Sequence, residues 1–359
     1  MVGGLESPSC PTTKQRIILA TMTILPRDAL ELQLQRIWEE LLDQRPISID
    51  ANFFELGGDS LTAMTLLARI VQETGYTVPA SGIMQAPTIE QLAKLLRQQA
   101  DARRWSPLVR LKSGESGRPL FLVHPLGGNV LCYLQLARRL RSARPVYAFQ
   151  SRGIDGEQPP SERIEEMASD YIDALRQVQP QGPYLLGGWS LGGIIAYEMA
   201  QQIHRAGESV ELLVFFDAGH LYAFAVMLTF FKKDTQDMWS RLASPEDDQI
   251  AFFREHTKEA QLIPQQADSE MARRIYRVVV ANMRALFNYH SQPYPGKVTL
   301  FRAQEKYIET PHDPEQEWRR LAREVEVIPS PGNHLTLVHE PHVETLAQRL
   351  DELLLRVAP

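Results

Sequence analysis

The pentapeptide Gly188-Trp189-Ser190-Leu191-Gly192 most constrains the fold of this chain, because of the segments on either side of it. Residues 184–186 predict a short strand, and residues 191–204 predict an apolar helix. A serine on such a strand-to-helix turn is held in strained backbone geometry, and glycines two positions before and after it leave room for the turn. The pattern makes Ser190 a candidate nucleophile. The competing interpretation is a glycine-rich packing turn, which gives the serine no role.

From about residue 118 onward, strand patterns alternate with helix patterns. The predicted strands are 120–123, 146–149, 184–186, 210–216, 298–301 and 325–328. Helices are predicted from Gly127-Gly128, at 164–178, at 191–204 and from about 343 to 357. This alternation is typical of a mainly parallel sheet covered by helices on both faces. Residues 219–291 interrupt it, are helical in character, and are predicted to project above the strand ends.

A serine hydroxyl needs a base that accepts its proton, and the sequence offers nine histidines. His334, in Pro331-Gly332-Asn333-His334-Leu335, follows the last predicted strand and could lean back over Ser190. His339 and His342 are rivals that fall at the start of the closing helix. His204 and His290 are more simply explained as solvated or structural side chains, and His124 belongs to a different loop.

The acid that orients such a histidine should also follow a strand. Asp217 ends the continuous apolar run 212–216, which predicts a buried strand. Glu305 and Asp313, after the next strand, are the competing choice, and Asp217 could instead cap the first helix of the insertion. The chain order of Ser190, Asp217 and His334 is the serine–acid–histidine order of α/β-hydrolases.

Acyl-transfer chemistry also needs donors for a developing oxyanion. One candidate is the backbone N–H of Leu191, directly after the serine. The second candidate is the N–H of Leu126, in the loop His124-Pro125-Leu126-Gly127-Gly128 after the first strand. Glycines let that backbone approach a substrate closely, although they could merely start the next helix.

The first hundred residues carry a different pattern. Residues 1–27 predict a tail, and residues 28–100 predict a small helical bundle. Asp28 can cap its first helix, with Glu31 at the reciprocal capping position. A second helix is predicted over 60–74, and a third starts at Thr88 with Gln91 completing a capping box. The core-facing side of the second helix is predicted to be Leu61, Met64, Leu67 and Val71. Residues 101–117 predict a linker.

Ser60 begins the second helix of this bundle, behind Leu56-Gly57-Gly58-Asp59. Helix N-termini favour phosphate groups through free N–H donors and the helix dipole. For an isolated serine, a simple helix cap is the better interpretation. The residues around Ser60 change that balance, as described below.

Composition excludes several classes of function. The net charge of −6 argues against nucleic-acid binding. Two cysteines form no disulfide framework, and the first residues lack the basic region of a signal peptide. The longest early apolar run, 17–26, is too short to span a bilayer, and no metal-ligand spacing or nucleotide-type glycine loop occurs. The sequence predicts a soluble cytoplasmic protein with no metal and no membrane or nucleic-acid partner.

Asn52-Phe53-Phe54-Glu55-Leu56-Gly57-Gly58-Asp59-Ser60-Leu61 resembles the attachment motif of peptidyl carrier domains in nonribosomal peptide synthetases. In that family the serine receives 4′-phosphopantetheine from coenzyme A. Residues from about 118 onward resemble the type I thioesterase domains that end such assembly lines. The matching segments are 124–128, 188–193, 215–217 and 332–334, and the insertion at 219–291 resembles the family's lid. The family places its acid where Asp217 stands, which favours it over Glu305.

The resemblance implies a four-helix, all-α carrier bundle followed by an α/β-hydrolase domain with a helical lid. It implies that an acyl or peptidyl thioester on the Ser60 arm transfers to Ser190 and leaves by hydrolysis or ring closure. The implied partners are that thioester substrate, a phosphopantetheinyl transferase and upstream synthetase modules. Two alternatives stay open: a serine esterase or lipase with an unrelated helical module, and a catalytically inactive, carrier-like interaction protein. The apolar run 223–231 of the lid could be plain core or could shed water around the acyl chain.

Overall fold

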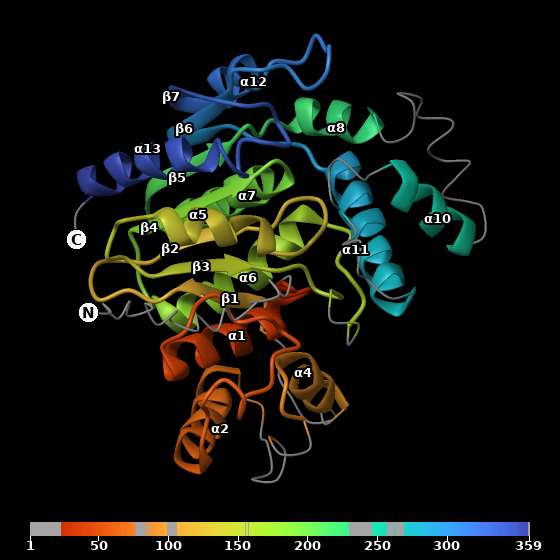
Figure 1. Cartoon of the computed structure of the whole chain (residues 1–359). Coiled ribbons are helices and arrows are strands. Elements are labelled where there is room, and N and C mark those ends of the chain that lie inside the picture. The colour runs from red at the N-terminus through yellow and green to blue at the C-terminus, as the bar shows by residue number, and fades with distance from the viewer. Residues whose placement is uncertain are drawn as a thin grey trace, which may run out of the picture.

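The computed structural model describes residues 23–74, 76, 83, 86–98, 106–154, 156, 158–229, 246–256, 262 and 269–357. Three helices near the N-terminus pack together, and a seven-stranded sheet with flanking helices forms the larger part of the molecule (Figure 1). The predicted tail at 1–27 falls mostly outside the described residues. Among the described residues, no helix is both long and apolar enough to cross a membrane.

The helical part contains α1 (Ala29–Leu42), α2 (Ser60–Thr74) and α4 (Ile89–Gln98). Asp28 caps α1 as predicted, because its carboxylate accepts the Glu31 N–H at 2.9 Å. The Thr88 hydroxyl likewise accepts the Gln91 N–H at 3.2 Å. In a capping box the Glu31 carboxylate would accept the N–H of the capping residue, Asp28. Here it accepts the N–H of Arg27 instead, one residue earlier. The Arg27 guanidinium draws Glu31 there, since the two side chains also form an ion pair at 2.7 Å.

The core of this bundle forms around Trp38 and Phe53, whose rings meet edge to face 5.0 Å apart. The predicted core face of α2 is partly wrong, because Val71 is 44% exposed. Leu67 is buried as predicted, and Leu66 and Ile70 are buried beside it, so the apolar face is rotated by about one residue along the helix. The side chains of Leu61 and Met64 lie outside the described part of the structure. The fourth helix implied by the resemblance would fall within 75–85, where the structure describes only Tyr76 and Ile83.

The sheet contains β1 (Leu108–Lys112), β2 (Leu120–Val123), β3 (Val146–Phe149), β4 (Tyr184–Trp189), β5 (Val210–Phe216), β6 (Tyr294–Ala303) and β7 (Ala322–Ser330). Its strand order is β1-β3-β2-β4-β5-β6-β7. Every neighbouring pair is parallel except β1 and β3, which are antiparallel. The expectation of a mainly parallel sheet is therefore confirmed.

Successive side chains of each central strand point to opposite faces of the sheet, so each strand contributes to two separate hydrophobic cores. Phe121 and Val123 of β2 join the cluster under α6 (Ile164–Val178) and α7 (Leu191–Arg205). Leu120 and Leu122 join the cluster on the other face, with α5 (Leu134–Arg139) and α13 (Val343–Arg356). Burial on both faces explains why these strands appear in the sequence as continuous apolar runs.

Four local predictions need correction. The expected linker contains strand β1, whose alternating Val109 and Leu111 are buried. Gly127-Gly128 forms a turn, and the helical segment starts later, with a 3₁₀ turn at Leu131–Tyr133 before α5. Strands β4, β6 and β7 are longer than predicted, because flanking residues pair with their neighbours. The helix α12 (Pro314–Leu321) was not predicted.

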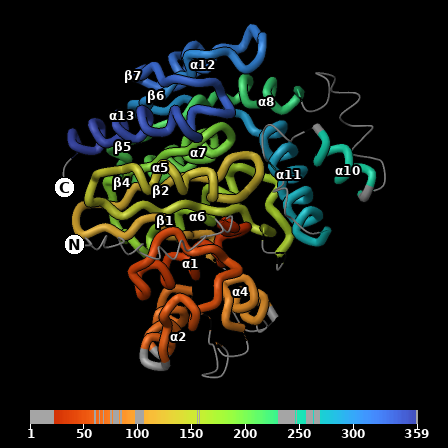
Figure 2. Tube along the Cα trace, viewed as in Figure 1, coloured from red at the N-terminus to blue at the C-terminus, as the bar shows by residue number. Residues whose placement is uncertain are grey.

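The insertion is helical where the structure describes it, with α8 (His220–Thr229), α10 (Glu246–His256) and α11 (Ser269–Asn288). In Figures 1 and 2 these helices lie together beside one end of the sheet. Ala223 and Met227 of α8 join the core cluster shared with α7. That part of the predicted apolar run is therefore core packing, and residues 230–231 of the run lie outside the described residues.

Helix α1 joins the helical part to the sheet (Figure 1). Leu32 is fully buried in the same cluster as Val109 and Leu111 of the edge strand β1. The Arg36 guanidinium donates to the carbonyl of Arg110 and, at 3.0 Å, to the Ser113 hydroxyl. Burial and the charge of Arg110 lower the pKa of Arg36. Helix α1 thus packs against the edge strand and satisfies one of its backbone carbonyls, that of Arg110.

This contact predicts that Leu32→Ala lowers the free energy of unfolding by about 2–5 kcal/mol, the usual cost of truncating a buried leucine. Leu355→Ala is the matched control, because Leu355 is 85% exposed and should change stability by no more than about 0.5 kcal/mol. Urea unfolding followed by circular dichroism measures both. Equal, small effects of the two substitutions would show that α1 does not pack on β1 in solution.

Candidate active site

Strand β4 runs into helix α7 through a turn at Ser190, whose backbone has φ of 55° and ψ of −122°. A positive φ is rare for a residue with a side chain, and such strain concentrates at functional positions. The Ser190 N–H donates to the carbonyl of Phe216 at 3.2 Å, which holds the turn against β5. The predicted elbow therefore exists as a strained strand-to-helix turn.

The two glycines of the motif are required because a side chain at either position would clash with the neighbouring backbone, not because of their φ angles. A Cβ added to Gly188 would lie 2.2 Å from the carbonyl carbon of Gly192. A Cβ added to Gly192 would lie 2.1 Å from the carbonyl oxygen of Val123, at the end of β2. Both separations are far below van der Waals contact, so the start of α7 can lie against β2 only with glycines at these positions.

The structure brings Ser190, His334 and Asp217 into one hydrogen-bonded chain. The His334 Nε2 lies 3.1 Å from the Ser190 Oγ, and the Nδ1 lies 3.0 Å from the Asp217 Oδ2. A carboxylate only accepts, so Nδ1 carries the proton and Nε2 is left to accept from the serine hydroxyl. Ser190, His334 and Asp217 are 8%, 2% and 0% exposed, so the chain is shielded from water. At these distances, His334 and Asp217 can activate the Ser190 hydroxyl.

Asp217 lies directly after β5, and its N–H donates to the carbonyl of Phe301. The second oxygen, Oδ1, accepts the Ala303 N–H at 3.0 Å and an Arg302 guanidinium N–H at 2.6 Å. Burial alone would raise the pKa of this carboxyl. The hydrogen bond and charge of His334, the charge of Arg302 and the Ala303 N–H outweigh burial and hold its pKa below the ordinary value.

The rival acids and bases lie elsewhere. Glu305 is exposed, and Asp313 caps α12 by accepting the Glu315 N–H. The His339 ring packs edge-on against Trp189, and His342 stands at the start of α13. The alternative role of Asp217 as cap of the first lid helix is wrong, because the Glu317 carboxylate accepts the N–H groups of His220 and Leu221.

The loop after β2 is fixed from two sides. His124 is fully buried, donates from Nδ1 to the Pro125 carbonyl at 2.8 Å and accepts from the Tyr171 hydroxyl at 2.7 Å. Burial lowers the pKa of His124 to about 4, so its ring is neutral near pH 7. Sequence reasoning gave this histidine no role, and its hydrogen bond shows that it braces the backbone next to Leu126.

Helix α11 braces the other side of this loop. The Asn282 side chain, fully buried, donates to the Leu126 carbonyl at 2.8 Å. A Cβ on Gly128 would lie 2.3 Å from the Val278 side chain, so α11 packs directly on the turn. The carbonyls of Val123 and His124 lie close to Gly192, so this loop borders the first turn of α7, which contains Leu191. The two predicted oxyanion donors therefore belong to adjoining segments.

In the helical part, the residues before Ser60 fold a loop against Phe53. Phe53 is fully buried, and a Cβ on Gly58 would lie 2.3 Å from its ring. Gly57 has φ of 97°, a conformation that favours glycine. The Asp59 carboxylate accepts the Thr62 N–H and hydroxyl, both at 2.7 Å. Asp59 therefore caps α2, and Ser60 is the first residue of the helix rather than its cap.

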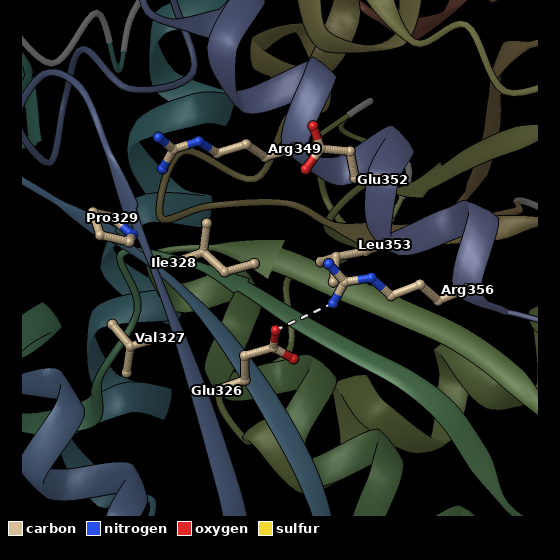
Figure 3. Close-up of a pocket in the computed structure, with 8 residues that line it drawn as sticks. All are labelled: Glu326, Val327, Ile328, Pro329, Arg349, Glu352, Leu353 and Arg356. Atoms are coloured by element: carbon tan, nitrogen blue, oxygen red, sulfur yellow. Dashed lines mark hydrogen bonds and ion pairs between the residues drawn. The ribbon is translucent and has the colours of Figure 1, made fainter.

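A surface pocket of about 300 Å³ lies between β7 and α13 (Figure 3). Glu326 from the strand and Arg356 from the helix face each other across it at 3.4 Å. None of its lining residues belongs to the Ser190–His334–Asp217 chain. Among the described residues, no group of three histidine, cysteine or carboxylate side chains is placed to hold a metal ion.

The fold and the hydrogen-bonded chain define an α/β-hydrolase domain with a serine at its elbow, preceded by a helical module. The thioesterase domain model matches residues 118–354, and the phosphopantetheine attachment site model matches residues 33–96. The chain belongs to the thioesterase domain family and carries a phosphopantetheine attachment domain ahead of it. It is a thioesterase, as its sequence predicted.

Similar curated proteins are much longer than this chain. A dimodular nonribosomal peptide synthase of Bacillus subtilis (strain 168) is 39% identical over 193 residues, which are 54% of this chain and 8% of that protein. Indigoidine synthase of Dickeya dadantii (strain 3937) is 39% identical over 190 residues, 53% of this chain and 13% of that protein. The chain thus matches only a small fraction of the length of these relatives.

Two solved structures show the same architecture. The four-domain nonribosomal peptide synthetase holo-AB3403 aligns with 92% of this chain and 26% of its own, at a TM-score of 0.75 and 29% identity. The NocB thioesterase domain, in covalent complex with a fluorophosphonate nocardicin G analogue, aligns with 67% of this chain and 95% of its own. Its TM-score is 0.52, and its sequence is 26% identical.

The close contact of α7 with β2 predicts that Gly192→Ala destabilises the protein by about 1–3 kcal/mol, the usual cost of overpacking. Gly127→Ala is the matched control, because its Cβ would meet nothing nearer than 3.5 Å. Thermal unfolding measures the stability of both variants. A Gly192→Ala protein as stable as Gly127→Ala would contradict the packing described for this turn.

Proposed function

We propose that this chain unloads an acyl or peptidyl group from a phosphopantetheine arm on Ser60 by transferring it to Ser190. The observation that carries the proposal is the hydrogen-bonded chain Asp217–His334–Ser190 in the same polypeptide as a carrier domain. Nonribosomal peptide synthetase relatives that match this region support the substrate class. Upstream synthetase modules are the source of the acyl group.

Ser60 is the residue that we propose to hold 4′-phosphopantetheine. It begins α2, where free backbone N–H groups and the helix dipole favour a phosphate. Gly57 and Asp59 ahead of it are exposed, so this backbone is open to a modifying enzyme. When bound, the arm supplies a thiol that presents the acyl group as a thioester. A phosphopantetheinyl transferase is the partner that attaches the arm.

His334 acts as the base. Its Nε2 accepts the proton of the Ser190 hydroxyl while the serine oxygen attacks the thioester carbonyl, and the acyl group becomes an ester of Ser190. The protonated ring then gives its proton to the departing thiolate. Asp217 holds the ring in the required tautomer and stabilises its positive charge. Burial of all three groups strengthens these interactions, since little water competes for them.

The negative charge on the carbonyl oxygen needs donors that are already in place. We assign the N–H groups of Leu191 and Leu126 to this oxyanion hole. The hydrogen bonds from His124 and Asn282 support the second of them, because they fix the Pro125 carbonyl of the same peptide and the Leu126 carbonyl of the next one. Loss of one such donor typically lowers the rate by about 10²–10³-fold.

Release of the acyl group from Ser190 repeats the sequence in reverse. The neutral His334 removes a proton from water, or from an internal amine or hydroxyl of the acyl chain, and that nucleophile displaces the serine oxygen. Water gives hydrolysis, and an internal nucleophile gives a ring. A cytoplasmic location for this reaction stays a prediction from the sequence.

Loading of Ser60 tests the carrier assignment. Full-length protein incubated with coenzyme A and a phosphopantetheinyl transferase should gain the mass of one arm, and Ser60→Ala should gain none. When the arm carries an acyl group, the protein with Ser190 should release that group and the Ser190→Ala variant should retain it. The expected loss of turnover is of order 10⁶-fold. Intact-protein mass spectrometry follows both steps. Absence of any mass gain would favour an esterase with an unrelated helical module.

Exchange of the acid tests the role of Asp217. Asp217→Asn should lower turnover by about 10⁴-fold, because an amide cannot hold His334 in the required tautomer. Glu305→Gln should leave turnover unchanged, since the Glu305 side chain is exposed. Release of acyl groups from the loaded carrier, followed by chromatography, compares the two variants. The reverse order of effects would assign the acid to Glu305.

A further inference from the structure

Each oxygen of the Asp217 carboxylate accepts a hydrogen bond from a basic side chain. His334 binds Oδ2 through Nδ1 at 3.0 Å, and Arg302 binds Oδ1 through Nη1 at 2.6 Å. The triad chemistry described above uses only the first of these contacts. Sequence reasoning gave Arg302 no role, because nothing in the pattern of β6 distinguishes it from a surface arginine.

Arg302 is held in place from three sides. Its guanidinium lies 5.3 Å from the ring centre of Tyr222, a residue of lid helix α8. Its Nε lies 3.8 Å from the Asp313 carboxylate at the start of α12. The Arg302 side chain is only 28% exposed, and Asp217 is fully buried. The ion pair with Asp217 is therefore screened far less than a surface pair.

We propose that Arg302 is a positioning residue for the Ser190–His334–Asp217 chain. Its guanidinium fixes the orientation of the Asp217 carboxylate and offsets part of the negative charge that the carboxylate presents to the imidazole. The inference rests on the proposed serine chemistry, although its test uses the reactivity of Ser190 alone. Arg302 is bound to Asp217 and not to the serine or the histidine, so it acts through the orientation of that carboxylate and through its own charge.

Arg302 acts on the Asp217 carboxylate both by fixing its geometry and by its charge. A carboxylate with one fixed donor on Oδ2 can still rotate, and the Arg302 and Ala303 donors on Oδ1 remove that freedom. The Arg302 charge also lies on the far side of the carboxylate from His334, where it repels a protonated imidazole. Asp217 and Arg302 together stabilise imidazolium less strongly than an unpaired aspartate would.

The groups that face this cluster come from several elements. Arg302 faces Asp217 after β5, Tyr222 of α8 and Asp313 at the start of α12. Around the imidazole lie Asp217, the Ser190 hydroxyl and the rings of Trp189, Tyr222 and Tyr307. Burial raises the pKa of Tyr222 well above the physiological range, so that phenol stays neutral. The charges that act on the imidazole are then Asp217, Arg302 and, through Arg302, Asp313.

The sign of the effect follows from these charges. Ser190 reacts when His334 is neutral, so its reactivity rises with pH through an acid limb. Arg302→Gln removes a positive charge, which favours imidazolium and leaves Asp217 less firmly ionised. Both consequences move the acid limb to higher pH, by about one pH unit or less, because Arg302 acts from beyond the carboxylate. Asp313→Asn removes a negative charge and should move the limb to lower pH by a few tenths of a unit, since the pair is partly exposed.

The test is the rate of Ser190 labelling by a fluorophosphonate across pH, on the full-length protein. Arg302→Gln and Asp313→Asn should shift the acid limb in opposite directions, and Arg302→Lys, which keeps the charge, should restore it. Asn is itself a good helix cap, so Asp313→Asn should leave α12 intact and keeps the test valid if Arg302→Gln folds poorly. Arg356→Gln is the matched control, because its ion pair with Glu326 lies in the pocket of Figure 3, apart from the triad residues.

Arg302→Gln and Asp313→Asn could instead lower the maximal labelling rate at high pH without moving the acid limb of the pH–rate curve. That result would overturn the proposal and leave Arg302 a purely structural residue. Shifts equal to that of Arg356→Gln would overturn it as well. Labelling needs neither the arm on Ser60 nor a natural substrate. If Ser190 labels with the expected shifts but the loaded carrier is not unloaded, the proposed function fails while the assignment of Arg302 stands.

Discussion

The close approach of helix α7 to strand β2 is the constraint on which the rest of the site depends. Gly192 has no room for a side chain against the Val123 carbonyl, and Gly188 has none against Gly192. Next to that contact, Ser190 has a positive φ at the end of β4 and lies at the start of α7, beside the loop that contains Leu126. A larger residue at either glycine would separate the helix from the sheet, and with it the serine from its proposed oxyanion donors.

The second organising feature is the balance of charge at Asp217. A fully buried carboxylate is costly unless it is paired, and here the partners come from two other parts of the chain. The Ala303 N–H and Arg302 come from the end of β6, and His334 comes from the loop after β7. Tyr222 of the lid helix α8 packs against both Arg302 and His334. The lid is therefore in direct contact with the charged groups of the site.

The carrier module and the hydrolase share more than a polypeptide connection. Leu32 of α1 completes the core around β1, and Glu73 of α2 forms an ion pair with Arg110 at 2.7 Å. The antiparallel edge strand β1 lies in the segment that sequence patterns predict as a linker. Its alternating side chains are few and its flanks are polar, so the strand is evident only when β3 on one side and α1 on the other bury it.

The sequence by itself determined the elements whose stability is local or strongly patterned. Glycine spacing, capping chemistry and continuous hydrophobic runs each act over a few residues. They therefore predict the serine elbow, the capped starts of α1 and α4, and the apolar strands β2, β3 and β5. The order serine, acid, histidine also follows from the chain alone. Tertiary structure decided what depends on distant partners: the cap that Glu317 gives to α8, the brace that Asn282 gives to the Leu126 loop, and the pairing of Arg302 with Asp217. Sequence position carries no information on these contacts, because each joins residues from separate strands, helices or loops that only the packed sheet brings within a few ångströms.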